Sequence, residues 1–208
     1  IFPKNKIKLL YDPFINPDEI RDKLKERLNK KNDNEKYFIS IGRLTHQKNF
    51  SLLINSFEII AKNFQNLNLK IIGEGEQKNI LENMIIKKNL TNRIFLLGYK
   101  KNIYKYLKKA ECFVLTSLWE DPGFVLVEAG YNNCQVITSD CPNGPKEIIS
   151  EDGGYLFQSN NASSFLGAIN NFFKDNDSVK VSKKIKLKKR LKEFTFFHHS
   201  LVLRKILV

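Results

Sequence analysis

The feature that most constrains the fold of this chain is a regular alternation between short apolar runs and longer amphipathic ones. Six short runs are mostly apolar, as buried parallel strands are: Tyr37–Gly42, Leu69–Gly73, Arg93–Gly98, Cys112–Thr116, Gln135–Ser139 and Gly154–Phe157. Five other segments have helical patterns: Phe50–Asn63, Gln77–Lys88, Ile103–Lys109, Phe124–Asn132 and Ala162–Lys174. This repetition predicts an α/β fold, with a parallel sheet of about six strands, right-handed crossovers and helices on both faces.

Two further segments flank the repeating unit and divide the chain into three parts. Residues 1–34 contain a predicted strand, Lys6–Tyr11, and a lysine-rich helix after Pro17. Residues 35–175 hold the repeating unit, and residues 176–208 are predicted to form one or two basic helices with an apolar, aromatic end. Because the sequence starts with Ile1 rather than methionine, we expect it to be a piece of a longer protein.

The chain is strongly basic, but its charge does not by itself select a partner. The formal net charge is +13, and eight of the thirteen residues in Lys180–Lys192 are basic. Such a surface attracts phosphate-rich partners, which include nucleic acid, anionic lipid and nucleotide diphosphates. An ordinary solvated lysine surface is the alternative interpretation.

Composition places the chain among cytoplasmic globular proteins. The apolar fraction of 42% excludes wholesale disorder, no run of eighteen apolar residues predicts a membrane span, and no signal pattern opens the chain. Three cysteines occur, at Cys112, Cys134 and Cys141, without a Cys-x-x-Cys pair. This odd number predicts neither a disulfide framework nor a zinc site, and a reducing cytosol fits best.

Chemistry is expected in the loops after the strands, because ligands of open parallel sheets bind at the carboxyl ends of the strands. After the first core strand, the loop opens with Gly42 and Arg43 and carries Lys48 just before a helix. A helix N-terminus adds partial positive charge and free amides, so two cations beside it suit a diphosphate. A solvated basic loop is the alternative.

The loop after the fourth core strand combines a turn, a helix start and two carboxylates. The amides of Gly123, Phe124 and Val125 lie at the predicted helix start, where they can bind an anion. Glu120 precedes the turn, and seven residues separate it from Glu128 on an otherwise apolar helix. Burying an acid without a partner is costly, so Glu128 either binds the hydroxyls of a ribose or pairs with a nearby lysine. Spacing alone does not decide between the two.

These motifs resemble the C-terminal domain of family-4 (group 1) glycosyltransferases, which have the two-Rossmann-domain architecture called GT-B. The hallmarks of that family are a Gly-Arg-Leu loop with a following Gln-Lys, here Gly42–Leu44 with Gln47 and Lys48, and glutamates separated by seven residues, here Glu120 and Glu128. Weaker family features occur in the same order, at Ile72–Gly75, Phe95–Tyr99 and Cys141–Ile149. The resemblance implies that the chain is one Rossmann-like half of a GT-B enzyme.

The resemblance also implies a role for each matched position. Arg43 and Lys48, in the loop that Gly42 opens, hold the donor diphosphate, and Glu120 is the catalytic residue, against the sugar hydroxyls near the reacting carbon. The other implied contacts are those of Gly123, Phe124 and Val125 with the phosphate or donor sugar, of Glu128 with the ribose, and of Leu97 and Tyr99 with the base.

No metal or cofactor is expected, because a diphosphate leaving group can be stabilised by other charges. Arg43, Lys48 and two helix N-termini supply them, as the resemblance also implies. The only Asp-x-Asp triplet, Asp175–Asp177, lies in a polar stretch at a helix end and is interpreted as a linker. The histidines are interpreted as surface or packing residues rather than metal ligands: His46, His198 and His199.

Other prominent residues are predicted to be structural. Trp119 and the many phenylalanines are expected in the core, and Cys141 has no histidine base beside it in the sequence. The basic segment Val179–Leu191 lacks one clean apolar face, so a solvated helix or interdomain clamp is favoured over a helix lying on an anionic membrane. Phe194–Leu207 is similar to the final helix that crosses back to the N-terminal domain in the resembling family.

We therefore expect a retaining glycosyltransferase that moves a hexosyl group from a nucleotide diphosphate sugar, UDP-linked, to a glycan or lipid-linked acceptor. The acceptor site lies in a missing N-terminal domain, so the chain alone is expected to bind nucleotide but turn over poorly. The expected location is the cytoplasm, with possible peripheral contact at the inner face of an anionic membrane. The alternatives are another GT-B relative, such as a glucan synthase or sugar epimerase, and a basic nucleic-acid-binding module, for which no aromatic RNA-binding motif is present.

Overall fold

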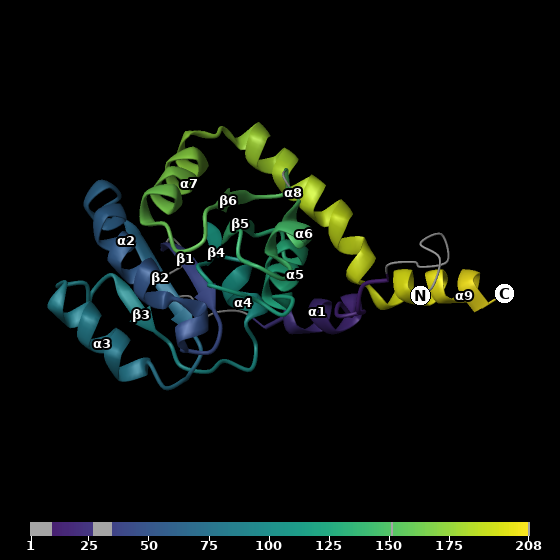
Figure 1. Ribbon diagram of the computed structural model, residues 1–208, viewed down its shortest axis with the longest axis horizontal. Coiled ribbons are helices and arrows are strands. Elements are labelled where there is room, and N and C mark those ends of the chain that lie inside the picture. Colours follow the sequence, from purple (N-terminus) through teal and green to yellow (C-terminus); the bar gives the residue numbers. More distant parts are fainter. Residues whose placement is uncertain (1–9, 27–34, 151, 208) are drawn as a thin grey trace.

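A six-stranded parallel sheet forms the centre of the fold in the computed structural model, which describes residues 10–26, 35–150 and 152–207 (Figure 1). The strands are β1 Lys36–Ile41, β2 Leu67–Ile72, β3 Ile94–Leu96, β4 Cys112–Leu115, β5 Gln135–Ser139 and β6 Tyr155–Phe157. Their order is β3-β2-β1-β4-β5-β6, and every neighbouring pair is parallel. The predicted α/β fold is confirmed, and this order is that of a Rossmann sheet.

Helices cover both faces of the sheet, as the sequence predicts. The helices are α1 Pro17–Lys23, α2 Phe50–Asn63, α3 Lys78–Lys87, α4 Tyr104–Leu107, α5 Phe124–Tyr131, α6 Pro145–Ile149, α7 Ala162–Lys174, α8 Asp177–Leu191 and α9 Phe196–Leu207. Core residues of α2, α3 and α7 pack on one face, and those of α1, α4, α5, α6 and α8 pack on the other. Along β1, Phe38 belongs to the first core, whereas Tyr37 and Ile39 belong to the second, because successive strand side chains point to opposite faces.

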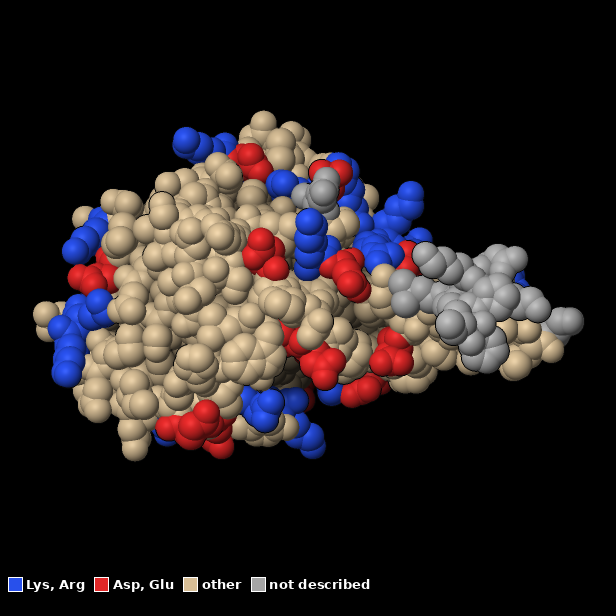
Figure 2. Space-filling view, viewed as in Figure 1, with Lys and Arg blue, Asp and Glu red and all other residues tan. Residues whose placement is uncertain are grey.

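The lysine-rich helix α8 is a strap across the second face. Leu187 and Leu191 are buried, and an added Cβ on Gly130 of α5 would lie 2.6 Å from both side chains. Val181 and Ile185 face outward, so the helix has no continuous apolar side, as expected. Basic side chains gather over α8 in the view of Figure 2, with acidic ones among them.

Segments near the two ends of the described chain meet where α8 ends. The amides of Phe14 and Ile15 donate to the Phe194 carbonyl at 2.9 and 3.0 Å, and Ile15 forms a parallel bridge with Thr195. Beyond this point α9 extends away from the sheet (Figure 1), and none of its residues is buried. Its Phe197 is 79% exposed.

Several expectations about single residues can be compared with the structure. Trp119 is 45% exposed, so its assignment to the core is wrong; it lies in the loop after β4, beyond the sheet that forms the core. Phe14, Phe196 and Phe197 are exposed as well, although many phenylalanines are buried as predicted. The three cysteines are buried and free: Cys112, Cys134 and Cys141.

At the start of the chain, residues 6–9 of the predicted strand Lys6–Tyr11 lie outside the described residues, and Leu10 and Tyr11 are not in a strand. The predicted helix after Pro17 is α1. Among the described helices, none combines the length and apolar character that a bilayer crossing requires.

Candidate active site

The strand order places a crevice between the loops that follow β1 and β4. The chain runs outward from β1 to β3 in one direction and from β4 to β6 in the other, so neighbouring loops diverge at this point. A pocket of 290 Å³ lies there, and we call it the central pocket. It is lined by Ile41, Gly42, Arg43, Lys48, Glu120, Asp121, Gly123, Phe124, Val125 and Glu128. Most of the site residues predicted from the sequence, including Arg43 and Glu128, thus share one pocket.

The β1 loop is fixed by close contact with the loop after β2. The amide of Gly42 donates to the Ile72 carbonyl at 3.0 Å, and the amide of Leu44 donates to the Glu74 carbonyl at 2.8 Å. An added Cβ on Gly73, whose φ is 147°, would lie 1.9 Å from the Gly42 carbonyl oxygen. Only glycine therefore allows this approach, which presents Arg43 exposed at the rim of the pocket.

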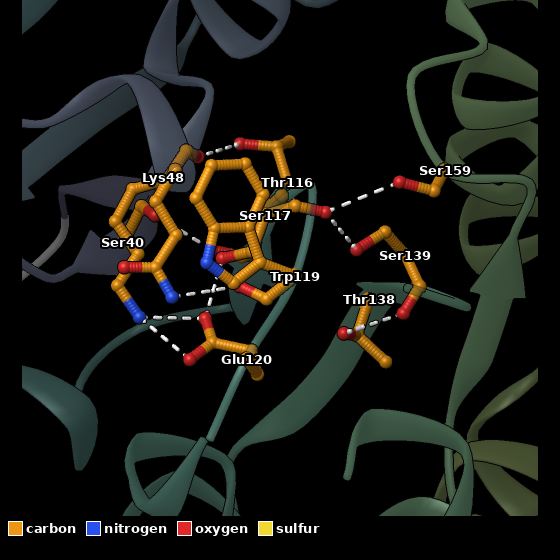
Figure 3. A network of polar contacts seen from close by, with 11 residues as sticks. Ser40, Lys48, Thr116, Ser117, Trp119, Glu120, Thr138, Ser139 and Ser159 are labelled. Atoms are coloured by element: carbon orange, nitrogen blue, oxygen red, sulfur yellow. Dashed lines mark hydrogen bonds and ion pairs between the residues drawn. The ribbon is translucent and has the colours of Figure 1, made fainter. Parts of the chain in front are cut away.

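Lys48 and Glu120 form a buried ion pair at the floor of the pocket (Figure 3). The Lys48 ammonium contacts the two carboxylate oxygens at 2.6 and 2.7 Å, and the side chains are 13% and 3% exposed. The Ser117 hydroxyl donates to the same carboxylate at 2.5 Å. The sequence placed both charged residues in the site but did not indicate that they pair or that Ser117 joins them.

Hydrogen bonds to backbone carbonyls hold the β4 loop on both sides of this ion pair. The Gln47 side-chain amide donates to the Trp119 carbonyl at 2.9 Å, and the Leu118 amide donates to the Gln47 carbonyl at 2.8 Å. On the other side, the Glu120 amide donates to the Pro142 carbonyl at 3.1 Å. The position of Glu120 is therefore defined by three loops, those after β1, β4 and β5.

Helix α5 begins at the pocket without a side-chain cap. Its N-cap is Gly123, whose φ of 86° lies in the left-handed region that favours glycine. An added Cβ there would lie 3.2 Å from Cγ of Glu120, so glycine also brings the turn close to the carboxylate. The first amides of an α-helix lack internal acceptors, and Phe124 and Val125, the first two residues of α5, line the pocket.

Glu128 lies on the same helix, further into the fold. The Tyr104 hydroxyl donates to Glu128 Oε1 at 3.0 Å, whereas the sequence had left open a lysine or a ribose as its partner. Burial raises the pKa of the Glu128 carboxyl above its usual range, and the Tyr104 hydrogen bond and the charge of Lys23 offset only part of that rise. The carboxylate thus keeps an oxygen that a further hydroxyl donor can occupy.

A second pocket of 380 Å³, which we call the side pocket, adjoins the first. It is lined by Ile41, Gly42, Arg43, Ile72, Gly73, Glu74, Tyr99, Lys100 and Ile103, so the two pockets share the start of the β1 loop. Tyr99 is 70% exposed at its edge. Leu97, expected beside Tyr99 at the base, instead lines a groove along the sheet edge at β3 and neither of these pockets.

The start of α2 differs from the sequence-based picture. A 3-10 turn, His46–Lys48, separates the β1 loop from the helix, and the Asn49 side chain caps the Leu52 amide at 3.4 Å. Phe50, the first helical residue, is buried and lines neither pocket. Among the described α-helices, α5 is the one whose first residues line the central pocket, and the structure does not place the start of α2 beside it.

The residues considered for metal binding have other contacts. Asp175 accepts a hydrogen bond from the Tyr155 hydroxyl at 2.8 Å, and Asn176 caps α8, so the Asp175–Asp177 triplet forms the junction between α7 and α8. His199 Nδ1 lies 3.0 Å from the Tyr11 carbonyl. Within the described part of the chain, no group of three or more His, Cys, Asp or Glu side chains is arranged to hold a metal ion.

Sequence reasoning missed Tyr104 and Ser117, whose hydroxyls bond the carboxylates of Glu128 and Glu120. Tyr104 opens a short helix after β3, and its contact with Glu128 joins positions 24 residues apart. Ser117 lies three residues before Glu120, and this short spacing was the one feature of the sequence that could have indicated their contact.

Fold and pocket together define a Rossmann-like domain with a crevice at its switch point, and this is the fold of GT-B glycosyltransferases. Two cations, three carboxylates and the start of α5 line the crevice. Residues 4–193 match the family described as "Glycosyl transferases group 1", and the chain belongs to this family. This membership favours an enzyme over the nucleic-acid-binding alternative.

Three similar proteins illustrate the relationship. An uncharacterised glycosyltransferase from Methanocaldococcus jannaschii is 47% identical over 112 residues, 54% of this chain and 28% of that protein. The N-acetylgalactosamine-N,N'-diacetylbacillosaminyl-diphospho-undecaprenol 4-alpha-N-acetylgalactosaminyltransferase of Campylobacter jejuni is 34% identical over 195 residues, 93% of this chain and 51% of that protein. The crystal structure of a TarM mutant from S. aureus, in complex with Fondaparinux, alpha-GlcNAc-glycerol and UDP, aligns with a TM-score of 0.71 and 29% identity over 83% of this chain and 35% of that chain. The chain thus spans about half or less of the length of these relatives.

Proposed function

We propose that this chain is the donor-binding, C-terminal half of a family-4 retaining glycosyltransferase that transfers a hexosyl group from a UDP-sugar to a glycan or lipid-linked acceptor. The observation that carries the proposal is the convergence of Arg43, Lys48, the α5 N-terminus and Glu128 in one pocket. Two cations and a helix terminus match a diphosphate, and a carboxylate matches vicinal hydroxyls.

The layout of the two pockets supports one orientation of the donor. The diphosphate lies at the α5 start between Arg43 and Lys48, and the ribose bonds Glu128 in the same central pocket. The base enters the adjoining side pocket, where Tyr99 borders it. The donor sugar then faces Glu120, which we propose as the catalytic residue that contacts the sugar hydroxyls.

The charges of the pocket support departure of the diphosphate without a metal ion. Negative charge grows on the leaving phosphate as the sugar bond breaks, and preorganised cations and amides stabilise it in the transition state. Arg43 is exposed and can bind the phosphate directly, whereas Lys48 is paired with Glu120 and must turn toward the phosphate. Donor binding therefore rearranges the ion pair.

The acceptor and the location are inferred from relatives. The Campylobacter relative is named for transfer to a diphospho-undecaprenol glycan, a lipid-linked acceptor. The lipid-linked acceptor of that relative supports activity at the cytoplasmic face of a membrane. We propose that the acceptor site belongs to an N-terminal domain, so this chain alone binds donor but turns over poorly.

Thermal unfolding with a panel of UDP-, GDP- and ADP-sugars in the presence of a chelator tests the donor site. A ligand that binds the folded state raises the midpoint, by an amount equivalent to about 2.7 kcal/mol at a hundredfold excess over Kd. UDP-sugars are expected to raise it, and Lys48→Ala and Glu128→Ala to abolish the rise. An equal rise in both variants would remove the site assignment.

A further inference from the structure

Ser117 is a buried hydroxyl aimed at the proposed catalytic carboxylate. The residue is 0% exposed, and its Oγ donates to Glu120 Oε1 at 2.5 Å. Among the described residues, Ser117 and Lys48 are the two whose side chains hydrogen-bond this carboxylate. Figure 3 shows that they approach it from different loops.

The backbone of Ser117 is itself held by two further serine hydroxyls. Ser139, the last residue of β5, donates to the Ser117 carbonyl at 2.7 Å, and Ser159 donates to it at 3.3 Å (Figure 3). Ser139 is also 0% exposed. Ser139 at the end of β5 and Ser159 after β6 therefore hold the peptide that carries the Ser117 side chain. The position of Ser117 is thus set by contacts within the protein rather than by the ligand.

A bound nucleotide-sugar affects the two hydrogen-bond partners of Glu120, Lys48 and Ser117, differently. The Lys48 ammonium borders the pocket and carries the charge that attracts a diphosphate, so a bound donor draws it away from the carboxylate. Ser117 is neutral, enclosed and outside the pocket lining, so a phosphate does not compete for it. After Lys48 turns, Ser117 is the side chain that still restrains Glu120.

We propose that Ser117 is a positioning residue, which keeps the Glu120 carboxylate directed at the donor sugar once Lys48 has turned to the diphosphate. This inference rests on the proposed function. Recognition of the donor then has two parts. The affinity for the nucleotide depends on Arg43, Lys48 and Glu128. The added affinity that the sugar provides depends on Glu120 and Ser117.

Calorimetric titration of the 208-residue chain with UDP and with UDP-N-acetylgalactosamine, UDP-N-acetylglucosamine and UDP-galactose separates these parts. The readout is the ratio of the Kd for UDP to the Kd for the tightest of the three UDP-sugars. Ser117→Ala is the test variant, and Ser117→Thr restores a hydroxyl at the same position. Ser40→Ala is the matched control, because Ser40 is equally enclosed and its hydroxyl donates to the Val114 carbonyl at 2.7 Å rather than to the site.

The expected result is a specific loss of the sugar contribution. Ser117→Ala leaves the Kd for UDP within about threefold and lowers the ratio about tenfold, the value of one hydrogen bond to a charged group. Ser117→Thr recovers most of the ratio, and Ser40→Ala leaves it unchanged. Retained UDP binding shows that the variants are folded.

Other results overturn the inference and differ from failure of the proposed function. If the unaltered chain favours a UDP-sugar over UDP and Ser117→Ala keeps that preference, Ser117 does not position Glu120 for the sugar. A loss as large in Ser40→Ala would show a general effect of removing a buried hydroxyl. If the unaltered chain binds neither UDP nor any of the sugars, the proposed function fails, and this inference fails with it.

Discussion

Replacing Lys48 by alanine is predicted to destabilise the ligand-free protein strongly. The substitution leaves the Glu120 carboxylate, which is 3% exposed, without its counter-ion. Removing one partner of a buried ion pair costs about 3 to 5 kcal/mol, because an uncompensated charge stays in the interior. We expect about 3 kcal/mol, the lower end of that range, because the Ser117 hydroxyl still bonds the carboxylate and Lys48 is itself 13% exposed.

Denaturant and thermal unfolding of three variants, compared with the unaltered chain, test this value. For a chain of this size, 3 kcal/mol lowers the melting temperature by about 6 to 12 °C. Lys48→Ala combined with Glu120→Gln is expected to recover about 2 kcal/mol, because the charge is gone and an amide oxygen still accepts from Ser117. The matched control is Lys62→Ala. The ion pair between Lys62 and Glu58 spans 3.5 Å, and the lysine side chain is 73% exposed. Such an exposed pair contributes less than about 1 kcal/mol to stability.

The double variant decides the cause of the loss, because it removes the buried charge together with its counter-ion. The reasoning would be refuted if Lys48→Ala lost no more stability than Lys62→Ala, or if adding Glu120→Gln gave no recovery.

Three further outcomes are expected. The pKa of Glu128 is raised in the folded state, so its contribution to stability is present below about pH 4.5 and declines as the pH rises through the raised pKa. The Glu128→Gln side chain can still accept from Tyr104. This variant should therefore melt no lower than the unaltered chain at pH 7 and no higher at pH 4, and it should lose donor binding. Gly73→Ala should cost more than about 3 kcal/mol, measured by urea unfolding, since its Cβ meets the Gly42 carbonyl at 1.9 Å. Leu187→Ala should cost about 2 to 5 kcal/mol and increase proteolysis within α8, and an unchanged cleavage rate would contradict the strap.

The sequence predicted the fold well because its information is local and periodic. Helices Phe50–Asn63 and Ala162–Lys174 and strand β5 have the predicted bounds, and the other strands differ by one or two residues at one or both ends. The parallel arrangement of the strands followed from the alternation of elements, which leaves few topologies available.

The sequence predicted which residues line the site, but it did not predict how they contact one another. Lys48 and Glu120 are 72 residues apart, and no spacing rule connects them. The start of α2 was interpreted from its position after a loop, whereas the Leu52 amide of that helix bonds the Asn49 cap. Trp119 was assigned to the core on residue type alone, although the loop that carries it projects beyond the sheet.

The direct measurement of the central claim uses Trp119, the single tryptophan of the chain, which neighbours Glu120 and is 45% exposed. Titration with a UDP-sugar in the presence of a chelator is predicted to change its fluorescence saturably, with the same Kd as calorimetry. Arg43→Ala, at an exposed rim position where folding is unaffected, is predicted to weaken that Kd at least about tenfold. An equal Kd in Arg43→Ala, or calorimetric binding that leaves the tryptophan signal unchanged, would place the donor elsewhere on the molecule.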